Sequence, residues 1–337
     1  MIVAVTPNPG LDRTLEVGRL RRGELHRVAR ATVEPGGKGI NVARVLRAHG
    51  LATEAVFPAG GAEGDALVAM LRHDIAVRCV AIAAPLRVNV AVVEPGGRVT
   101  KLNEEGPELS AEDGQALLAA VREASRGAGW VVSCGSLPRG LPIDFHAQVV
   151  AAAHAEGARA AVDTSGDPLT AALAAGPDLV KPNREELEDA VGRRVETFGE
   201  AVAAARALCD GGARRVLASF GSEGAILLDG DTTLHGIAPC AHVQSTVGAG
   251  DALLAGFLAA ADEPPAGALR QAVEWAAQSV ATPGNGVTAL APSPVSAGVV
   301  TAEIDPDRRL GVEALEPRLL VGEVTASLDG LAQMREE

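Results

Sequence analysis

An acidic residue stands directly beside a glycine turn in residues 245–251, which read Ser-Thr-Val-Gly-Ala-Gly-Asp and precede the apolar run 252–261. Two glycines ahead of an alanine- and leucine-rich run predict a tight turn that opens a helix. Free backbone N–H groups at a helix start, together with the helix dipole, favour an anion. If a phosphoryl group binds the amides of Gly248, Ala249 and Gly250, Asp251 could take a proton from an attacking hydroxyl. The alternative is that Asp251 only stabilises the first turn of a buried helix.

A second glycine turn occupies residues 34–41, Glu-Pro-Gly-Gly-Lys-Gly-Ile-Asn. Gly36 and Gly37 would let the backbone approach a ligand closely, Lys38 could meet a phosphate, and Asn41 could bond hydroxyl groups. A simple turn before a helix explains the same glycines without a ligand. No G-x-x-x-x-G-K-[ST] motif occurs, so a nucleotide would not be held by a P-loop. The absence of G-x-G-x-x-G after the first strand disfavours a dinucleotide enzyme.

Two further segments allow both a structural and a functional interpretation. Asn183 and Glu186 have the spacing of a capping box, which requires no function. Alternatively, both side chains face a crevice, where Glu186 could hold water on Mg²⁺. Residues 219–224 (Ser-Phe-Gly-Ser-Glu-Gly) are typical of a hairpin turn between two strands. The sequence alone leaves these alternatives open.

Lysine is rare in this chain: of the 30 basic residues only Lys38, Lys101 and Lys181 are lysines, and the others are arginines. An ammonium is a compact point charge that the planar guanidinium of arginine does not replace. The lysine positions are therefore candidates for binding an anion. Chance placement is the alternative, and Lys101 and Arg87 lie at the edges of a predicted β-insertion, where polar residues usually face water.

The composition limits the classes of partner. The 337 residues carry a formal net charge of −13, which argues against binding nucleic acid or an anionic membrane surface, since both need a cationic footprint. The four cysteines show no C-x-x-C spacing, so neither a zinc site nor a disulfide framework is indicated. The chain begins at once as a strand, and its longest apolar run is half a membrane span. We therefore expect a soluble cytoplasmic protein.

The elements that position these residues alternate between strand and helix, which predicts an α/β fold with a mostly parallel central sheet between two layers of helices. Two β-rich insertions, residues 12–34 and 87–104, interrupt the alternation and could form a small sheet over one edge of the core. Beyond residue 292 the chain is rich in proline and charge. We expect one domain at residues 1–295 and a loosely attached tail at residues 296–337.

The polar and glycine-rich segments follow predicted strands. They are residues 6–12, 134–138, 181–183 and 219–224. In open α/β sheets, ligands bind outside the carboxyl ends of the strands. These segments could therefore line one crevice.

Taken together, the motifs resemble the ribokinase-like (PfkB) carbohydrate kinases, in particular the phosphosugar branch that includes 1-phosphofructokinase, tagatose-6-phosphate kinase and a 6-phosphofructokinase. The similarity covers residues 1 to about 295 and implies a three-layer α/β/α core with a small β-sheet lid. Each motif is weak alone, but six occur in the order of the family. They are residues 6–12, 36–43, 135–138, 181–186, 219–221 and 247–251.

The resemblance implies a role for each motif residue. Asp251 would be the catalytic base, with the amides of Gly248, Ala249 and Gly250 as the anion hole. The sugar phosphate would contact Asp12, Gly36, Gly37, Lys38, Asn41, Arg87, Ser136 and possibly Lys101. ATP would contact Lys181, Asn183, Ser219, Gly221, Gly224 and Asn285, with Mg²⁺ on Glu186 through water. The lid often forms a dimer contact in this family, so a homodimer is expected.

Fructose 1-phosphate is the first substrate implied, phosphorylated by ATP at its 6-hydroxyl, and fructose 6-phosphate and tagatose 6-phosphate are close rivals. Two residues depart from the family pattern. Ser245 stands where many relatives carry an aspartate linked to a monovalent cation, so cation activation is in doubt, and Leu86 replaces a more usual threonine. A non-catalytic sugar-phosphate sensor is the rival from another class, and the retained Asp251 argues against it.

Overall fold

The computed structural model describes residues 1–96, 98–240, 243, 245–282, 300–302 and 304–311. Within this part of the chain, the strands of the main sheet are β1 (Ile2–Val5), β4 (Thr53–Ala59), β5 (Ala76–Ala81), β8 (Trp130–Cys134), β9 (Arg159–Asp163), β10 (Leu179–Val180), β11 (Arg215–Ser219), β12 (Ala225–Asp229), β13 (Thr232–Ile237) and β14 (Val300–Ala302). The helices are α1 (Lys38–Ala48), α2 (Gly61–Leu71), α3 (Ala111–Ser125), α4 (Phe145–Ala155), α5 (Asp167–Leu173), α6 (Arg184–Val191), α7 (Phe198–Asp210), α8 (Ala249–Ala259) and α9 (Pro265–Val280).

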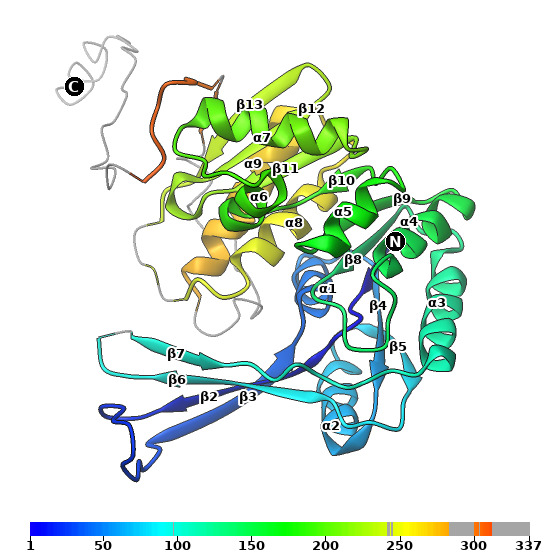
Figure 1. Cartoon of the computed structure of the whole chain (residues 1–337), viewed down its shortest axis with the longest axis vertical. Coiled ribbons are helices and arrows are strands. Elements are labelled where there is room, and N and C mark those ends of the chain that lie inside the picture. Colours follow the sequence, from blue (N-terminus) through cyan, green and yellow to red (C-terminus); the bar gives the residue numbers. More distant parts are fainter. Residues whose placement is uncertain (97, 241–242, 244, 283–299, 303, 312–337) are drawn as a thin grey trace, which may run out of the picture.

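The described strands form a ten-stranded sheet in the order β14-β13-β12-β11-β10-β9-β8-β1-β4-β5 (Figure 1). In the part of this order that runs β11-β10-β9-β8-β1-β4-β5, neighbouring strands are parallel. At the other end, β12, β13 and β14 each pair antiparallel with the strand before them. The parallel run places the carboxyl ends of β1, β8, β9, β10 and β11 along the same edge of the sheet. This arrangement confirms the predicted mostly parallel α/β core.

Helices cover both faces of the main sheet, because the strands are apolar on both sides. Ile2 and Ala4 of β1 pack in a core with α1, α2, α8 and α9. Val3 and Val5 alternate to the other side and pack in a second core with α3, α4, α5, α6 and α7. Side chains alternate along a strand, so two apolar layers require strands with almost no polar residue. The three-layer architecture is confirmed.

A smaller sheet has the strand order β3-β2-β6-β7, built from β2 (Gly10–Glu16), β3 (Arg30–Gly36), β6 (Arg87–Val93) and β7 (Val99–Leu102). These strands come from the two predicted β-insertions, and Figure 1 shows them projecting from the core beside α1. We call this four-stranded unit the lid sheet. Its strand β2 begins five residues after β1 ends, and β3 leads directly into α1.

Residues 300–302 and 304–311 differ from the expected loose tail. β14 pairs with β13 through His235, Gly236 and Ile237, and Leu310 is buried against the core. The elements β5, α5 and β13 were not predicted from the sequence. The expected domain boundary at residue 295 lies outside the described residues and stays a prediction.

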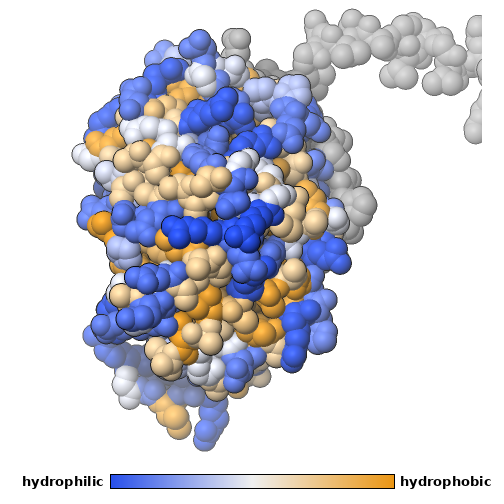
Figure 2. All heavy atoms as spheres, turned by 90° about the vertical axis from the view of Figure 1, so that its right-hand side faces the viewer, coloured by the Kyte–Doolittle hydropathy of each residue, from blue (hydrophilic) through white to orange (hydrophobic). Residues whose placement is uncertain are grey.

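The surface of the described residues is mixed in character. Because 47% of the chain is hydrophobic, part of the surface must be apolar. On the face that Figure 2 shows, hydrophilic and hydrophobic residues are interspersed. Among the described helices, none combines the length and the hydropathy that a membrane span requires.

Candidate active site

Asp251 lies in the first turn of α8 and is almost completely buried. Its Oδ2 accepts a hydrogen bond of 2.9 Å from Nδ2 of Asn41, which lies on α1. Burial, and next the charge of Asp163, raise the pKa of Asp251 to about 7, although the bond from Asn41 opposes the shift. A carboxylate whose pKa lies near neutrality can hold and release a proton at physiological pH, as a general base must.

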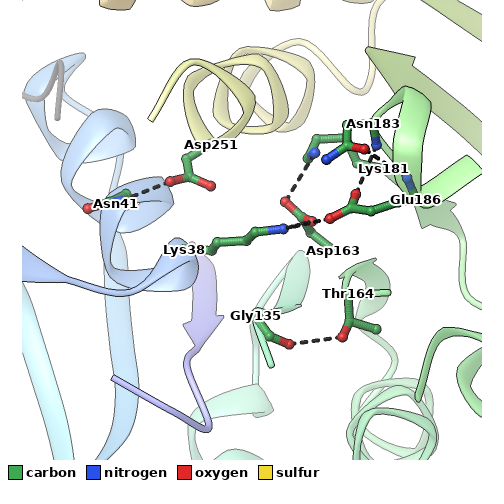
Figure 3. Close-up of polar contacts among 9 residues, drawn as sticks. All are labelled: Lys38, Asn41, Gly135, Asp163, Thr164, Lys181, Asn183, Glu186 and Asp251. Carbon is green, nitrogen blue, oxygen red and sulfur yellow. Dashed lines mark hydrogen bonds and ion pairs between the residues drawn. The ribbon is translucent and has the colours of Figure 1, made fainter. Parts of the chain in front are cut away.

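A cluster of two lysines and two carboxylates lies beside Asp251 (Figure 3). Nζ of Lys38 lies 2.8 Å from Oδ1 of Asp163 and 3.2 Å from Oε1 of Glu186. Nζ of Lys181 lies 3.2 Å from Oδ2 of the same aspartate. Although burial opposes it, the two carboxylates raise the pKa of Lys38 above its ordinary value. At Asp163, burial alone would raise the pKa of the carboxyl group. The charges of Lys181 and Lys38 outweigh burial and hold that pKa below its ordinary value. Lys38 and Asp163 therefore both stay charged at neutral pH.

Two helix N-termini open toward this cluster without a side-chain cap. Gly248 precedes α8 with a φ of 81°, a conformation that only glycine adopts readily, and Gly37 precedes α1 with a φ of 131°. The first N–H groups of such a helix have no partner within the helix. A Cβ added at Gly250 would lie 3.4 Å from Nζ of Lys181, so this ammonium reaches the start of α8. Amides and ammonium together could form a cradle for a phosphoryl group.

Glu186 forms the capping box that its spacing with Asn183 indicates, and its second carboxylate oxygen lies in the lysine–carboxylate cluster. Its Oε2 accepts a 2.9 Å bond from the backbone N–H of Asn183, whose Oδ1 accepts from the N–H of Glu186 at 2.8 Å. This reciprocal capping box fixes the start of α6. The other oxygen, Oε1, lies 3.2 Å from Nζ of Lys38. One carboxylate thus anchors a helix and contributes charge to the site.

The lid sheet supplies a polar region on the other side of α1. Oδ1 of Asp12 accepts a 2.9 Å bond from Nδ2 of Asn89, and a Cβ at Gly36 would lie within 2.7 Å of the same oxygen. Lys101 lies exposed on β7, paired with Ala91, and so shares a sheet face with Asn89. It does not reach the lysine–carboxylate cluster.

Asn8 connects the lid sheet to the main sheet. Its Nδ2 donates to Oγ of Ser136 at 3.1 Å and to the carbonyl of Glu105 at 3.0 Å. The backbone carbonyl of Asn8 accepts a 2.9 Å hydrogen bond from the Arg87 guanidinium. Asn8 therefore brings Arg87 and Ser136 to one place, where a cation and a hydroxyl could bind a phosphate.

Residues 219–224 form the hairpin between β11 and β12, with a single 3-10 turn, η1 (Gly221–Glu223). Ser219 forms a bridge with Asn183 next to the capping box. Gly221 and Gly224 have φ angles of 59° and 84°, and a Cβ at Gly224 would overlap the carbonyl of Gly236. The hairpin interpretation is confirmed, and the hairpin borders the same sheet edge as the cluster. Asn285 lies outside the described residues.

The donor set fits a nucleotide with Mg²⁺. The described residues hold no group of three His, Cys, Asp or Glu side chains that would form a dedicated metal cage. Mg²⁺ usually keeps several waters and binds through one or two carboxylates together with substrate phosphates. Asp163 and Glu186 could hold it in this way, next to the phosphoryl cradle at α8.

Sequence reasoning missed Asp163 and the linking role of Asn8. Both lie at the carboxyl end of a buried strand. Asp163 is the last residue of β9, and Asn8 follows β1. An acidic residue that ends an apolar parallel strand was the available signal. Lys38, Asn41, Lys181, Asn183, Glu186 and Asp251 were identified, and the structure brings them together.

Comparisons with known proteins agree with this geometry. Residues 11–291 match the profile described as "pfkB family carbohydrate kinase". The chain is 39% identical to a 1-phosphofructokinase of Rhodobacter capsulatus over 268 residues, which cover 77% of this chain and 83% of that protein. It is 37% identical to the ATP-dependent 6-phosphofructokinase isozyme 2 of Escherichia coli over 257 residues, covering 75% and 83%. The crystal structure of E. coli phosphofructokinase-2 with fructose-6-phosphate superposes with a TM-score of 0.79 at 31% identity, covering 88% of this chain and 98% of that one.

A buried aspartate at an uncapped helix start, two lysines on a shared carboxylate and a second, smaller sheet occur together in this chain, which matches one family profile over most of its length. The chain belongs to the pfkB family of carbohydrate kinases, phosphotransferases that act on a sugar hydroxyl.

Proposed function

We propose that this protein transfers the γ-phosphoryl group of ATP to the 6-hydroxyl of fructose 1-phosphate, yielding fructose 1,6-bisphosphate and ADP. The observation that carries the proposal is the buried Asp251 beside the cradle formed by the α8 amides and Lys181. Several curated 1-phosphofructokinases, identical at 34–39%, support the choice of substrate.

The reaction follows from the position of each group. The oxygen of the sugar 6-hydroxyl forms a bond to the γ-phosphorus, the bond from that phosphorus to the bridging oxygen breaks, and ADP leaves. Asp251 accepts the hydroxyl proton, late in the step because an alcohol is a weak acid. The α8 amides, Lys181 and Lys38 stabilise the charge on the transferred group. Mg²⁺, held by Asp163 and Glu186, would neutralise phosphate charge.

The sugar would lie between α1 and the lid sheet. Asp12 and Asn41 would bond its hydroxyls, and Gly36 and Gly37 would allow the backbone to approach. Arg87 and Ser136, brought together by Asn8, would bind its phosphate. Because Lys38 is paired with Asp163 and Glu186, we assign it to the transferred phosphoryl group more than to the phosphate already on the sugar. Lys101 would join the sugar phosphate only when the lid sheet approaches the core.

A panel of four acceptors tests this proposal: fructose 1-phosphate, fructose 6-phosphate, tagatose 6-phosphate and fructose, each with MgATP. ADP release is measured by a coupled assay, and the product is identified by mass and by phosphorus NMR. We expect fructose 1-phosphate to give the highest kcat/KM. A preference for fructose 6-phosphate would assign the protein to the activity of its E. coli relative instead. No ADP release with any acceptor would favour the sugar-phosphate sensor.

The lid sheet would form a homodimer contact. Asp12, Asn89 and Lys101 lie on one of its faces, whereas Leu15, Val33, Val90 and Leu102 lie on the other. This second face also carries the exposed Arg13, and Val33 and Leu102 on it are 44% and 60% exposed. Burying it against a second copy would remove this surface from water. Light scattering that shows a monomer at working concentration would overturn the dimer.

Activation by a monovalent cation is a separate question at Ser245. Oγ of Ser245 accepts a 3.2 Å bond from the N–H of Val247, and a hydroxyl contributes less negative charge than the aspartate of many relatives. The E. coli phosphofructokinase-2 has been solved in complex with potassium. We propose that this chain depends weakly on such a cation. Equal rates in potassium chloride and tetramethylammonium chloride would support this, and a tenfold activation by potassium would contradict it.

A further inference from the structure

Residues 304–311, which we call the C-terminal strap, lie across the start of α7 and beside the hairpin 219–224. They fall outside the segment 11–291 that matches the family profile. The strap follows β14, which completes the described end of the main sheet. Its contacts give it a role that the family motifs do not assign.

The strap satisfies the backbone of α7. The N–H of Phe198 donates to the carbonyl of Arg308 and the N–H of Gly199 donates to the carbonyl of Pro306, both at 2.9 Å. These are the first N–H groups of the helix, which have no partner within it. A Cβ at Gly199 would lie 2.9 Å from the Pro306 oxygen, so the strap needs glycine there. The N–H of Leu310 donates to Glu196 at 2.8 Å, and the Leu310 side chain is buried.

Arg308 extends from the strap to the hairpin. Its guanidinium lies 5.0 Å from the centre of the Phe198 ring and donates a 2.7 Å bond to Oε2 of Glu223. The Glu223 side chain is only 11% exposed, and Arg308 is its one basic partner among the described residues. A largely buried carboxylate is costly unless it is paired.

Glu223 belongs to η1, the turn that shapes the hairpin. Its carbonyl accepts a 2.6 Å bond from Nε2 of His235, whose ring packs edge-on against Phe198 at 4.6 Å. The backbone and the side chain of Glu223 are therefore held from the same side, by β13 and by the strap. At the start of the hairpin, Ser219 bridges to Asn183, next to the capping box of α6.

We propose that Arg308 is a positioning residue for the nucleotide: by neutralising and anchoring Glu223, it holds the hairpin 219–224 in the conformation that receives ATP. This inference rests on the assignment of the hairpin to ATP in the proposed function. Without Arg308, the Glu223 carboxylate must leave its buried place to reach water, and the turn moves with it. The unpaired negative charge would also repel the ATP phosphates.

Three variants test the proposal: Arg308→Met, Arg308→Met with Glu223→Gln, and the control Arg309→Met. Arg309 is the exposed neighbour of Arg308, so its replacement removes the same charge from the strap without touching the hairpin. We expect Arg308→Met to raise the calorimetric Kd for MgATP and the KM for ATP about tenfold, which corresponds to about 1.4 kcal/mol. The KM for the sugar phosphate and kcat should stay within twofold of wild type. The double variant should recover most of the ATP affinity.

A purely structural strap would give a different pattern, namely a lower Tm for Arg308→Met with unchanged ATP affinity, and this would overturn the proposal. A parallel rise in the KM of both substrates would overturn it too. Amide hydrogen exchange tests the role of Arg308 independently of whether the protein is a sugar-phosphate kinase. Faster exchange of amides 220–224 in Arg308→Met, and not in Arg309→Met, supports the anchoring even if no acceptor is phosphorylated. Unchanged exchange there refutes it.

Discussion

Replacing Asp251 by asparagine should strongly lower turnover and should make the protein increasingly more stable than wild type as the pH rises. Burial and Asp163 raise the pKa of Asp251 from its ordinary 3.8 to about 7 on folding. The folded state therefore binds this proton more tightly than the unfolded chain does. Wild type loses stability as the pH rises from about 4 to about 7, and the loss is complete above that range.

The size of the effect follows from the shift. One pKa unit corresponds to 1.36 kcal/mol, so the ionised Asp251 costs at most about 4 kcal/mol, of which about 3 kcal/mol appears between pH 5 and pH 8. Asparagine does not ionise, and its Oδ1 can still accept the bond from Asn41. The stability of Asp251→Asn relative to wild type should therefore grow by about 3 kcal/mol over this interval. Loss of the base should lower kcat by about 10³-fold.

Urea unfolding of both proteins at pH 5, 6, 7 and 8 measures the difference in their free energies of unfolding. Groups that titrate alike in the two proteins contribute equally to both values, so their contributions cancel in the difference. Asp231→Asn is the matched control: Asp231 is exposed in the turn between β12 and β13, so its variant should follow wild type at every pH. A stability difference for Asp251→Asn that stays constant from pH 5 to pH 8 would refute the raised pKa. Near-normal turnover would remove Asp251 from the role of base.

Three further predictions concern other parts of the molecule. Lys38→Met should lower kcat/KM by at least about 10²-fold. Because Lys38 lowers the pKa of Asp251, the same variant should move the acid limb of the pH–rate profile to higher pH, and an unmoved limb would contradict this. Gly224→Ala should lower the free energy of unfolding in urea by more than about 3 kcal/mol, because the φ of Gly224 is positive and an added Cβ meets Gly236. Gly230 also has a positive φ but no atom near an added Cβ, so Gly230→Ala should lower it by about 1 kcal/mol. Equal losses would argue against the close contact. Leu102→Asp should convert a lid-sheet dimer to monomers in light scattering, and a persistent dimer would place the interface elsewhere.

Much of the fold was predictable because two periodicities dominate the chain. Doubly apolar strands such as β1 and β8 and capped helices such as α3 are local patterns, and the motifs at the strand ends share one edge by topology. The antiparallel end was not predictable in this way. The polar and apolar residues of β13 alternate only weakly. β14 contains β-branched residues but is only three residues long, and it pairs with a strand more than sixty residues away.

The site was predictable where glycine or lysine marked it. Asp163 was missed because one aspartate after Val162 looks like an ordinary strand end, and its importance comes from two lysines that lie 125 and 18 residues away in sequence. At Glu186 the capping box is a local pattern that the sequence shows, whereas the contact of its other oxygen with Lys38 joins residues that lie 148 positions apart. Arg308 and Glu223 meet only through tertiary packing.

The order of the strands also has a consequence for synthesis on the ribosome. The parallel strands appear early in the chain and can pair as they emerge, whereas β13 keeps an unpaired edge until Val300–Ala302 has been made. Exposed edge strands are prone to pairing with other chains. A nascent chain that stalls between residues 237 and 300 would therefore present the edge of β13 to its neighbours, and premature termination there should yield aggregated product even though most of the two cores is already encoded.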